Sequence, residues 1–360
     1  MKHLSGVNLG GFFSQVKDDI FTDGHLDTFI TEKDIQQIKN WGFNSVRLPV
    51  DNFFFETAPF KYDESRLKRV DKVITDAEKH GLDVILDLHK APGHSFAFKE
   101  RESNNIWDKS SESNKRFLHI WDMFSKRYAQ RPNMLLELMN EPVAPEASQW
   151  NAICDDAIAV IRNNDKHHSI IVESNLWGMC RQFENLKKFD DDNIIYSFHF
   201  YEPILITHQF APWVSFVIYD IYKKAVKYPG RPDGIGDAIK LTEEKDNKFA
   251  ELLRGQDRMW DINELEKAMQ PVFDFQKKHN VPVYCGEFGV VVLADPETRK
   301  NWLNDFISIM KKHKISYSYW SYKNMDFGVI DHTELYKDNP NYDKNRLDGN
   351  TLKALQNGIL

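Results

Sequence analysis

The sequence of 360 residues contains little cysteine and no long apolar run. Its three cysteines, Cys154, Cys180 and Cys285, lie far apart, which argues against a disulfide framework and against a Cys-x-x-Cys zinc site. No stretch reaches the roughly 18 apolar residues that a membrane-spanning helix needs. The N-terminal residues lack the apolar segment of a signal peptide. We therefore expect a cytoplasmic protein, or a secreted one if a signal peptide has been removed.

Positive charge is also in short supply. The chain carries 47 Lys and Arg against 54 Asp and Glu, which gives a formal net charge of −7. No block of Lys and Arg is dense enough to bind a phosphate backbone, and the overall negative charge disfavours nucleic acid as a partner. The sequence also contains neither GxGxxG nor GxxxxGK[ST], the loops that mark a nucleotide-binding open sheet.

Short apolar runs alternate with longer stretches of helical periodicity along the chain. The runs are rich in β-branched or aromatic residues and cover 4–9, 43–49, 82–88, 134–138, 169–173, 194–200, 281–285 and 315–320. Stretches such as 64–80 and 261–279 carry apolar residues at helical intervals. Eight strands alternating with helices imply a parallel sheet, either an open doubly wound sheet or a closed (β/α)8 TIM barrel. The length and the missing nucleotide loop favour the barrel.

One interval interrupts this alternation. Residues 201–260 separate the sixth expected strand from its helix, which is far longer than a usual loop between a strand and a helix. They include an apolar and aromatic stretch at 210–222. We expect a single (β/α)8 domain over residues 1–360, in which 201–260 forms an inserted lid or subdomain above the site. The alternative is a segment packed on the flank of the barrel.

Polar side chains follow the expected strands, where the catalytic residues of a barrel lie. In chain order they are Asn8, Arg47, His89, Asn140, Glu141, Glu173, His199, Tyr201, Glu287 and Trp320. Glu141 and Glu287 follow the fourth and seventh strands, so that a barrel can bring them together across its mouth. Glycoside hydrolysis needs such a pair, with one carboxyl protonated to assist the leaving oxygen and the other ionised to attack or to activate water.

Seven segments in chain order resemble glycoside hydrolase family 5, the group that contains cellulases, mannanases and exo-β-1,3-glucanases. They are GVNLGGFF, GFNSVRLPV, LDLHKAPG, LMNEP, SFHFYEP, CGEFGV and SYWSYKN. The resemblance implies a retaining β-glycosidase in which Glu141 is the acid/base and Glu287 is the nucleophile. It also implies that Asn140 contacts the sugar 2-hydroxyl and that Trp320 forms an aromatic platform under the sugar.

The same resemblance gives supporting roles to four further residues. Arg47 lies beneath the nucleophile, His89 belongs to the third-strand pattern, and His199 and Tyr201 support the site and orient the nucleophile. Three of the four have a plainer alternative, because Arg47 can be a salt-bridged barrel residue and the two histidines can be satisfied core residues. Trp320 can likewise be simple barrel packing.

Weaker candidates for the site are Asn8, Asp51, Trp177, Lys323 and Asp326. Asp51 either contacts substrate or caps a helix, and Trp177 can line the cleft. Lys323 and Asp326 follow the eighth strand in the manner of the exo-glucanase-like members of the family. Gln15, however, stands where some of those members carry a substrate-binding Glu, which counts against exo-β-1,3-glucanase activity.

The resemblance implies a β-linked oligo- or polysaccharide as the partner, with neither nucleic acid nor a membrane, and it implies no metal and no organic cofactor. A β-1,4-glucan or its oligosaccharides is the first expectation for the substrate. An exo-β-1,3-glucanase, a β-glucosidase, a β-mannanase and a non-catalytic carbohydrate-binding barrel are the alternatives. A retaining mechanism predicts carboxyl groups about 5–5.5 Å apart, whereas a separation of about 7 Å or more indicates an inverting mechanism.

Overall fold

The computed structural model describes residues 2–97, 103–211, 213, 222, 224–243, 247–331 and 346–360. Within these residues, eight strands close into a parallel barrel in the order β1-β10-β9-β8-β7-β6-β5-β2. The strands are β1 (Ser5–Asn8), β2 (Ser45–Asp51), β5 (Asp83–Lys90), β6 (Met134–Glu137), β7 (Ser169–Glu173), β8 (Ile194–Phe200), β9 (Val283–Phe288) and β10 (Ser316–Tyr319). The predicted (β/α)8 barrel is confirmed.

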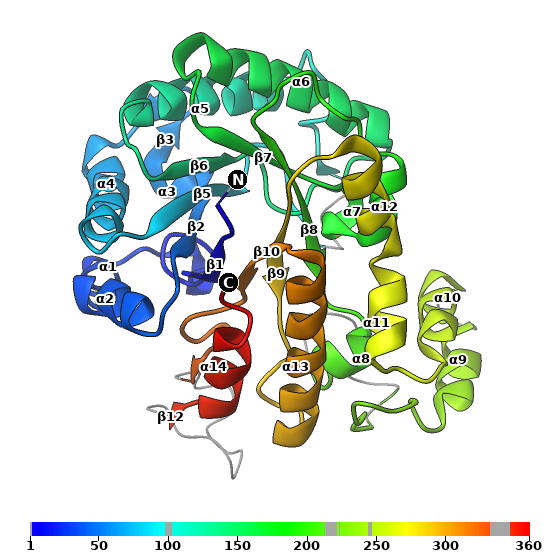
Figure 1. Cartoon of the computed structure of the whole chain (residues 1–360). Coiled ribbons are helices and arrows are strands. Elements are labelled where there is room, and N and C mark those ends of the chain that lie inside the picture. The colour runs from blue at the N-terminus through cyan, green and yellow to red at the C-terminus, as the bar shows by residue number, and fades with distance from the viewer. Residues whose placement is uncertain are drawn as a thin grey trace. The chain divides into compact units, whose positions relative to one another are not determined.

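Helices and two-stranded sheets stand between these strands along the chain (Figure 1). The α-helices are α1 (Asp23–Thr28), α2 (Glu32–Asn40), α3 (Asn52–Phe55), α4 (Glu64–Lys79), α5 (Glu112–Tyr128), α6 (Ala147–Asn164), α7 (Asn175–Gly178), α8 (Ile204–Thr207), α9 (Ile235–Glu243), α10 (Asn247–Gln256), α11 (Ile262–Ala268), α12 (Gln270–His279), α13 (Pro296–His313) and α14 (Gly349–Gln356). Two 3-10 helices are η1 (Lys17–Asp19) and η3 (Cys180–Glu184), and the two-stranded sheets pair β3 (Glu56–Ala58) with β4 (Lys61–Tyr62) and β11 (Ile330–Asp331) with β12 (Arg346–Leu347). None of the described helices combines the length and the apolar character that crossing a membrane requires.

The local signals in the sequence explain most of these elements. In α4, for example, the Asp63 side chain accepts hydrogen bonds from the backbone N–H groups of Ser65 and Arg66, which caps the helix at its N-terminus. Its apolar residues at helical spacing are buried, as the periodicity predicts. The stretch predicted as one helix over 261–279 is instead two helices that divide at Met269, just before Pro271. Proline has no N–H to donate to a continuing helix.

The interior of the barrel is built in layers. Three neighbouring strands each carry an apolar residue and, two positions later, a carboxylate: Ile85 and Asp87 on β5, Leu135 and Glu137 on β6, and Ile171 and Glu173 on β7. Residues two apart on a strand point to the same side, so both members of each pair share one face. The apolar members join Leu4, Ile195 and Tyr284 in one buried cluster. The carboxylates therefore form the next layer, toward the carboxyl ends of the strands.

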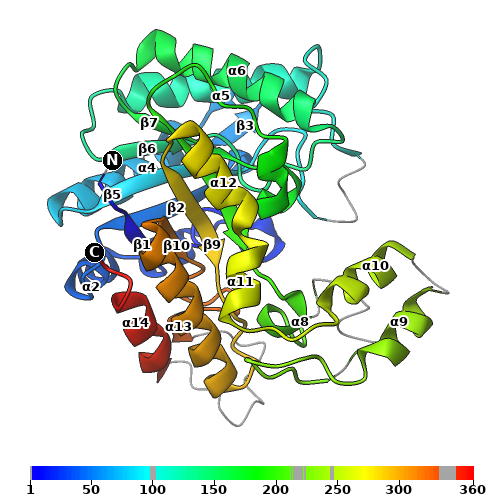
Figure 2. The same ribbon diagram turned by 45° about the vertical axis from the view of Figure 1, so that its right-hand side comes forward.

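The chain divides into two compact units. The first comprises residues 1–199, 271–287 and 315–318, and holds the barrel strands except the last residues of β8, β9 and β10. Helices α5 and α6 run side by side in this unit (Figure 1). The second comprises 200–270, 288–314 and 319–360. In it, α9 lies beside α10 and α13 beside α14 (Figure 2).

The interval at 201–260 belongs to the second unit and contains α8, α9 and α10 in its described part. Most of the apolar stretch at 210–222 lies outside the described residues. The expectation of a single domain with an inserted lid or subdomain stays a prediction.

Candidate active site

Arg47 is the centre of a buried ionic cluster. Its side chain lies on β2 and is fully buried. Nε and Nη2 donate to the two oxygens of Glu137 at 2.7 and 3.1 Å, and Nη2 also lies 3.0 Å from Oδ2 of Asp87. Nη1 donates to Oε1 of Glu287 at 2.7 Å. One guanidinium therefore pairs with carboxylates from β5, β6 and β9, which compensates charges that would be costly to bury alone.

Two asparagines complete the hydrogen bonds of this guanidinium. Nη1 donates to Oδ1 of Asn8 at 3.0 Å, and Nη2 donates to Oδ1 of Asn140 at 2.9 Å. The amide of Asn8 in turn donates to the backbone oxygens of Gly286 and Ser318, at 2.9 and 3.2 Å. Asn8 thus ties β1 to β9 and β10. Because its oxygen faces Arg47, Asn140 turns its NH2 group away from the guanidinium.

The structure brings Glu141 and Glu287 together, although 146 positions separate them in the chain (287 minus 141). Glu141 follows β6 and Glu287 lies on β9, and one oxygen of each lies within 4.8 Å of the other and of a ring nitrogen of His199. Both side chains are largely buried, with exposed fractions of 16% and 7%. Glu141 also has a left-handed backbone, with φ of 47°. Such strain in a residue with a side chain concentrates at functional sites.

The surroundings of the two carboxyl groups differ. Burial, followed by the negative charge of Glu287, raises the pKa of Glu141 well above its usual range. Burial also raises the pKa of Glu287, but the Arg47 guanidinium, which hydrogen-bonds to it directly, acts in the opposite direction. We conclude that Glu141 keeps its proton to a higher pH than Glu287 does.

Two buried histidines lie against these carboxylates. Nδ1 of His199 is 3.1 Å from Oε1 of Glu141 and 3.7 Å from Oε2 of Glu287. Nδ1 of His89 is 2.7 Å from Oδ2 of Asp87. Burial lowers the pKa of His89 to about 4 and that of His199 well below its usual value. Both rings are therefore neutral near pH 7, which makes each of them a donor at one nitrogen and an acceptor at the other.

This cluster of buried carboxylates, guanidinium and neutral imidazoles can be compared with known proteins. Residues 8–326 match the family model for Cellulase (glycosyl hydrolase family 5). The chain belongs to glycoside hydrolase family 5. Endoglucanase C from Acetivibrio thermocellus is 35% identical over 328 residues, which cover 90% of this chain and 92% of the relative. Cellodextrinase A from Ruminococcus flavefaciens is 32% identical over 317 residues, which cover 87% and 83%.

Solved structures agree with this family 5 assignment. A hyperthermophilic endo-β-1,4-glucanase in complex with substrate aligns with a TM-score of 0.73 and 25% identity, over 98% of this chain and 96% of that one. Endoglucanase Cel5A from Thermotoga maritima aligns with a TM-score of 0.71 and 26% identity, over 97% and 96%. The predicted family, the barrel and glycoside hydrolase activity are confirmed, and the substrate of this enzyme is a carbohydrate.

Two of the weaker candidates for the site, Asp51 and Trp177, lie in the first compact unit, which holds most of the barrel strands. Asp51 is buried at the end of β2, where its Oδ2 accepts a hydrogen bond from the backbone N–H of Gln15 at 3.1 Å and lies 3.8 Å from Nζ of Lys90. Asp51 occupies the N-cap position of α3, but its side chain makes no capping hydrogen bond there. Trp177 is half-buried, with φ of 61°, and its indole N–H donates to the backbone oxygen of Phe96 at 2.7 Å.

The remaining sequence-predicted residues lie in the second compact unit: Tyr201, Trp320, Lys323 and Asp326. Tyr201 packs its ring edge-on against His208 and Phe327. The backbone N–H of Trp320 donates to the oxygen of Phe288 at 3.0 Å, and the backbone oxygen of Asp326 accepts from Val292 at 2.7 Å. Their roles toward substrate stay predictions.

Sequence reasoning did not single out Asp87 or Glu137, and it placed Glu173 at a strand end without giving it a role; all three are fully buried. A signal for them was present, because LDLH and LLEL each place a carboxylate inside an apolar run. A strand of a parallel barrel is covered on both faces, so such a carboxylate must be paired or protonated. The signal identifies the buried acids but does not name their partners.

Two groups of side chains in the described part of the enzyme have the spacing of metal ligands. They are Glu137, Glu173 and His199, and Glu141, His199 and Glu287. In the first group Arg47 bonds both oxygens of Glu137, and in the second it bonds Oε1 of Glu287. A guanidinium held this close repels a second cation, so these groups do not fit a metal ion.

Proposed function

We propose that this enzyme hydrolyses β-1,4-glucan chains or their oligosaccharides with retention of anomeric configuration. The observation that carries the proposal is the approach of Glu141 and Glu287 to within 4.8 Å through one oxygen of each. Retaining glycosidases hold their carboxyl groups about 5–5.5 Å apart, whereas inverting ones need about 6.5–9.5 Å to admit water. The short separation in this barrel supports the retaining geometry.

The surroundings of each carboxyl suit one role in a double displacement. Glu287, held toward its ionised form by Arg47, attacks the anomeric carbon, and the bond to the leaving oxygen breaks as a glycosyl-enzyme ester forms. Glu141, which keeps its proton longer, gives it to that leaving oxygen. In the second step Glu141 takes a proton from water, the water oxygen bonds to the anomeric carbon, and Glu287 is released as a carboxylate.

Asn140 and Trp320 contact the sugar in the proposed mechanism. The hydrogen bond from Arg47 holds the Asn140 oxygen, which leaves its NH2 group as the donor for a sugar 2-hydroxyl. A contact to the 2-hydroxyl is expected to strengthen in the transition state and so to contribute to rate. Trp320 supplies the aromatic platform that the family resemblance implies.

The names of the relatives support a β-1,4-glucan substrate, because they include endoglucanases and a cellodextrinase. A β-mannan is the second candidate, because Thermotoga maritima Cel5A has been solved with mannotriose as well as with cellobiose. Incubation with cello-, laminari- and manno-oligosaccharides of defined length, followed by analysis of product lengths, tests the choice. Internal cleavage of cello-oligosaccharides is expected. Turnover of laminari- or manno-oligosaccharides alone would replace the β-1,4-glucan proposal.

The assignment of Glu141 predicts a selective defect in Glu141→Ala. Hydrolysis of natural oligosaccharides is expected to fall by about 10²–10⁴-fold, the usual contribution of general acid–base catalysis. An aryl glycoside with an activated leaving group is affected less in its first step, because that leaving group departs without a proton. Azide, which attacks without general-base assistance, is expected to restore turnover of this substrate and to give a β-glycosyl azide.

The pH profile provides a second measurement on the same variant. A general acid works only when protonated, so kcat/KM of the wild type falls as the pH rises through the pKa of Glu141, which burial and Glu287 raise. This alkaline limb is expected to disappear in Glu141→Ala with the activated substrate. Glu184→Ala, at an exposed Glu of the same unit, is the matched control. An unchanged alkaline limb in Glu141→Ala would contradict the assignment.

A further inference from the structure

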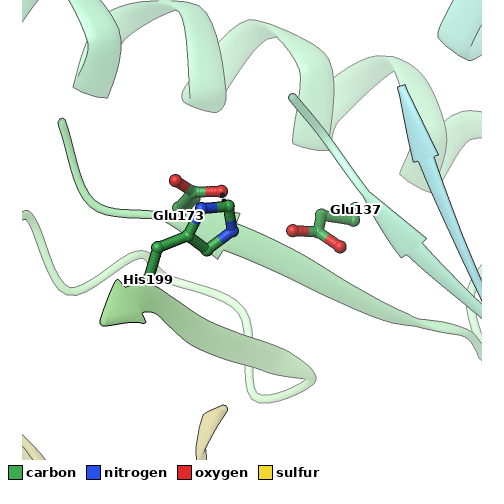
Figure 3. A group of neighbouring side chains, drawn as sticks. All are labelled: Glu137, Glu173 and His199. Atoms are coloured by element: carbon green, nitrogen blue, oxygen red, sulfur yellow. Dashed lines mark ion pairs between the residues drawn. The ribbon is translucent and has the colours of Figure 1, made fainter. Parts of the chain in front are cut away.

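Glu173 is a buried carboxyl group with an unusual set of partners. It is the last residue of β7, and its side chain is fully buried. Oε2 lies 3.2 Å from Nε2 of His199, within hydrogen-bonding distance (Figure 3). Among the described residues, both oxygens of Glu173 and Nε2 of His199 are buried without a hydrogen bond of good geometry, so the 3.2 Å contact is a close approach of two unsatisfied groups. Arg47, the cation of the cluster, directs its bonds to Glu137, Glu287 and Asp87 instead.

The packing around Glu173 and His199 is tight. Gly178, which ends α7, has φ of 68°, and a side chain there would collide with Oε1 of Glu173 and with the backbone nitrogen of His199. Glu137 faces the same pair, since one of its oxygens lies within 4.8 Å of a Glu173 oxygen and of a His199 ring nitrogen (Figure 3). Glu173 therefore sits in a confined space beside another carboxyl group, that of Glu137.

These surroundings favour the neutral form of Glu173. Burial, then the charges of Glu137 and Glu141, raises the pKa of Glu173 well above its usual range. Glu287 adds to this effect, and Arg47 opposes it. A neutral carboxylic acid has one O–H to donate, and Nε2 of His199 is the acceptor within reach.

His199 stands between two carboxyl groups and cannot donate to both. Burial and the nearby charges of Arg47 and His89 keep the ring neutral by lowering its pKa well below the usual value. Nδ1 is 3.1 Å from Oε1 of Glu141, and Nε2 is 3.2 Å from Oε2 of Glu173. Because a neutral imidazole carries one N–H, a hydrogen bond at both contacts requires that one nitrogen accepts a proton donated by a carboxyl group.

We propose that Glu173 is a neutral carboxylic acid that donates to Nε2 of His199, holds that ring as its Nδ1–H tautomer, and so positions Glu141. The inference rests on the proposed acid/base role of Glu141. In this arrangement Oε1 of Glu141 always receives the N–H of His199, and Oε2 carries the proton that passes to the leaving oxygen. The same N–H stabilises the Glu141 carboxylate in the second step. Glu173 and His199 keep their own protons throughout the cycle.

The tautomer of His199 can be measured without any turnover. Nitrogen-15 NMR of the whole enzyme, labelled at histidine, distinguishes a protonated from an unprotonated ring nitrogen. The His199 signals are assigned by their loss in His199→Asn. We expect a protonated Nδ1 and an unprotonated Nε2 over the pH range of activity. A ring protonated at Nε2, or at both nitrogens, would overturn the proposal, whatever Glu141 does in catalysis.

Two variants at Glu173 give a kinetic test. Glu173→Gln retains an N–H donor of nearly the same length, whereas Glu173→Leu is of similar size and cannot donate. We expect kcat to fall by about ten-fold or more in Glu173→Leu, a part of the general acid–base contribution, and to be largely recovered in Glu173→Gln. Loss of the Nδ1–H donor destabilises the ionised form of Glu141, so the alkaline limb of kcat/KM is expected at higher pH in Glu173→Leu only.

The outcomes separate a positioning role from a purely structural one. A structural role would lower the melting temperature of Glu173→Leu without moving its alkaline limb. If Glu173 worked as an ionised acceptor, His199 would be protonated at Nε2 in the wild type, and the proposal would be wrong; Glu173→Gln alone does not separate the two cases, because its amide can accept as well as donate. Should Glu173→Leu fail to fold, the tautomer of His199 in the wild type decides between the neutral and the ionised form of Glu173. Failure of the acid/base assignment of Glu141 is detected separately, by the activity and pH profile of Glu141→Ala.

Discussion

Glu287→Gln is expected to lower kcat on an aryl β-cellobioside by about 10⁴-fold or more, as removal of a catalytic nucleophile does in other enzymes. The amide of Gln cannot form the glycosyl ester that the carboxylate of Glu287 forms. The side chain keeps its size and an oxygen that can accept from Nη1 of Arg47. We therefore expect the variant to fold, with a circular dichroism spectrum like that of the wild type.

Two further measurements make this result specific. Glu184→Gln, an exposed change of the same chemistry in the barrel unit, is expected to retain full activity. A 2-deoxy-2-fluoro glycoside with a good leaving group is expected to accumulate as a covalent adduct, which mass spectrometry of proteolytic peptides locates at Glu287. If Glu287→Gln kept kcat within about ten-fold of the wild type, or the adduct lay on another residue, Glu287 would not be the nucleophile.

Arg47→Met is expected to destabilise the fold by about 3–5 kcal/mol, the usual cost of leaving buried charges without their partner. Methionine fills part of the volume but cannot pair with Asp87, Glu137 and Glu287. It also leaves Glu287 without the cation that favours its ionised form, so we expect activity to be lost as well. Urea unfolding, extrapolated to zero denaturant, measures the change in the free energy of unfolding.

A surface arginine provides the control for this change. Arg69 pairs with Asp23 and Asp27, whose side chains are 80% and 61% exposed. Arg69→Met is expected to cost about 0–1 kcal/mol, because water screens and replaces such pairs. An equal loss of stability in the two variants would contradict the account of Arg47 as the centre of a buried cluster.

The loss of folding stability in Arg47→Met is expected to become larger as the pH rises. Burial raises the pKa of Asp87 and of Glu137 to about 7 in the wild type, and Arg47 acts against this rise. Without Arg47 both values increase, so the folded variant binds protons that the unfolded chain has already released. Stability of the variant therefore falls as the pH rises. We expect the loss of unfolding free energy relative to the wild type to be smaller at about pH 5 than at about pH 8. A loss that grows as the pH falls would exclude this mechanism.

Local patterns in the sequence were enough to predict the barrel, but they set the ends of some strands too early. The run predicted as a strand over 82–88 is β5 (Asp83–Lys90), and that over 281–285 is β9 (Val283–Phe288). His89 and Glu287 consequently lie on strands, not after them. The apolar pattern stops where the polar site begins, but backbone pairing continues because these side chains find partners in the barrel interior.

The sequence by itself determined the order of strands and helices, the family and the presence of acidic residues at the strand ends, because each of these is encoded in short segments. Only the tertiary structure decided which acids share Arg47 and that His199 lies between Glu141 and Glu173. Arg47 and Glu287, for instance, are 240 positions apart and meet through closure of the barrel. Proton positions in this cluster depend on burial and on charges from several strands at once. These combined effects cannot be predicted from any local pattern in the chain.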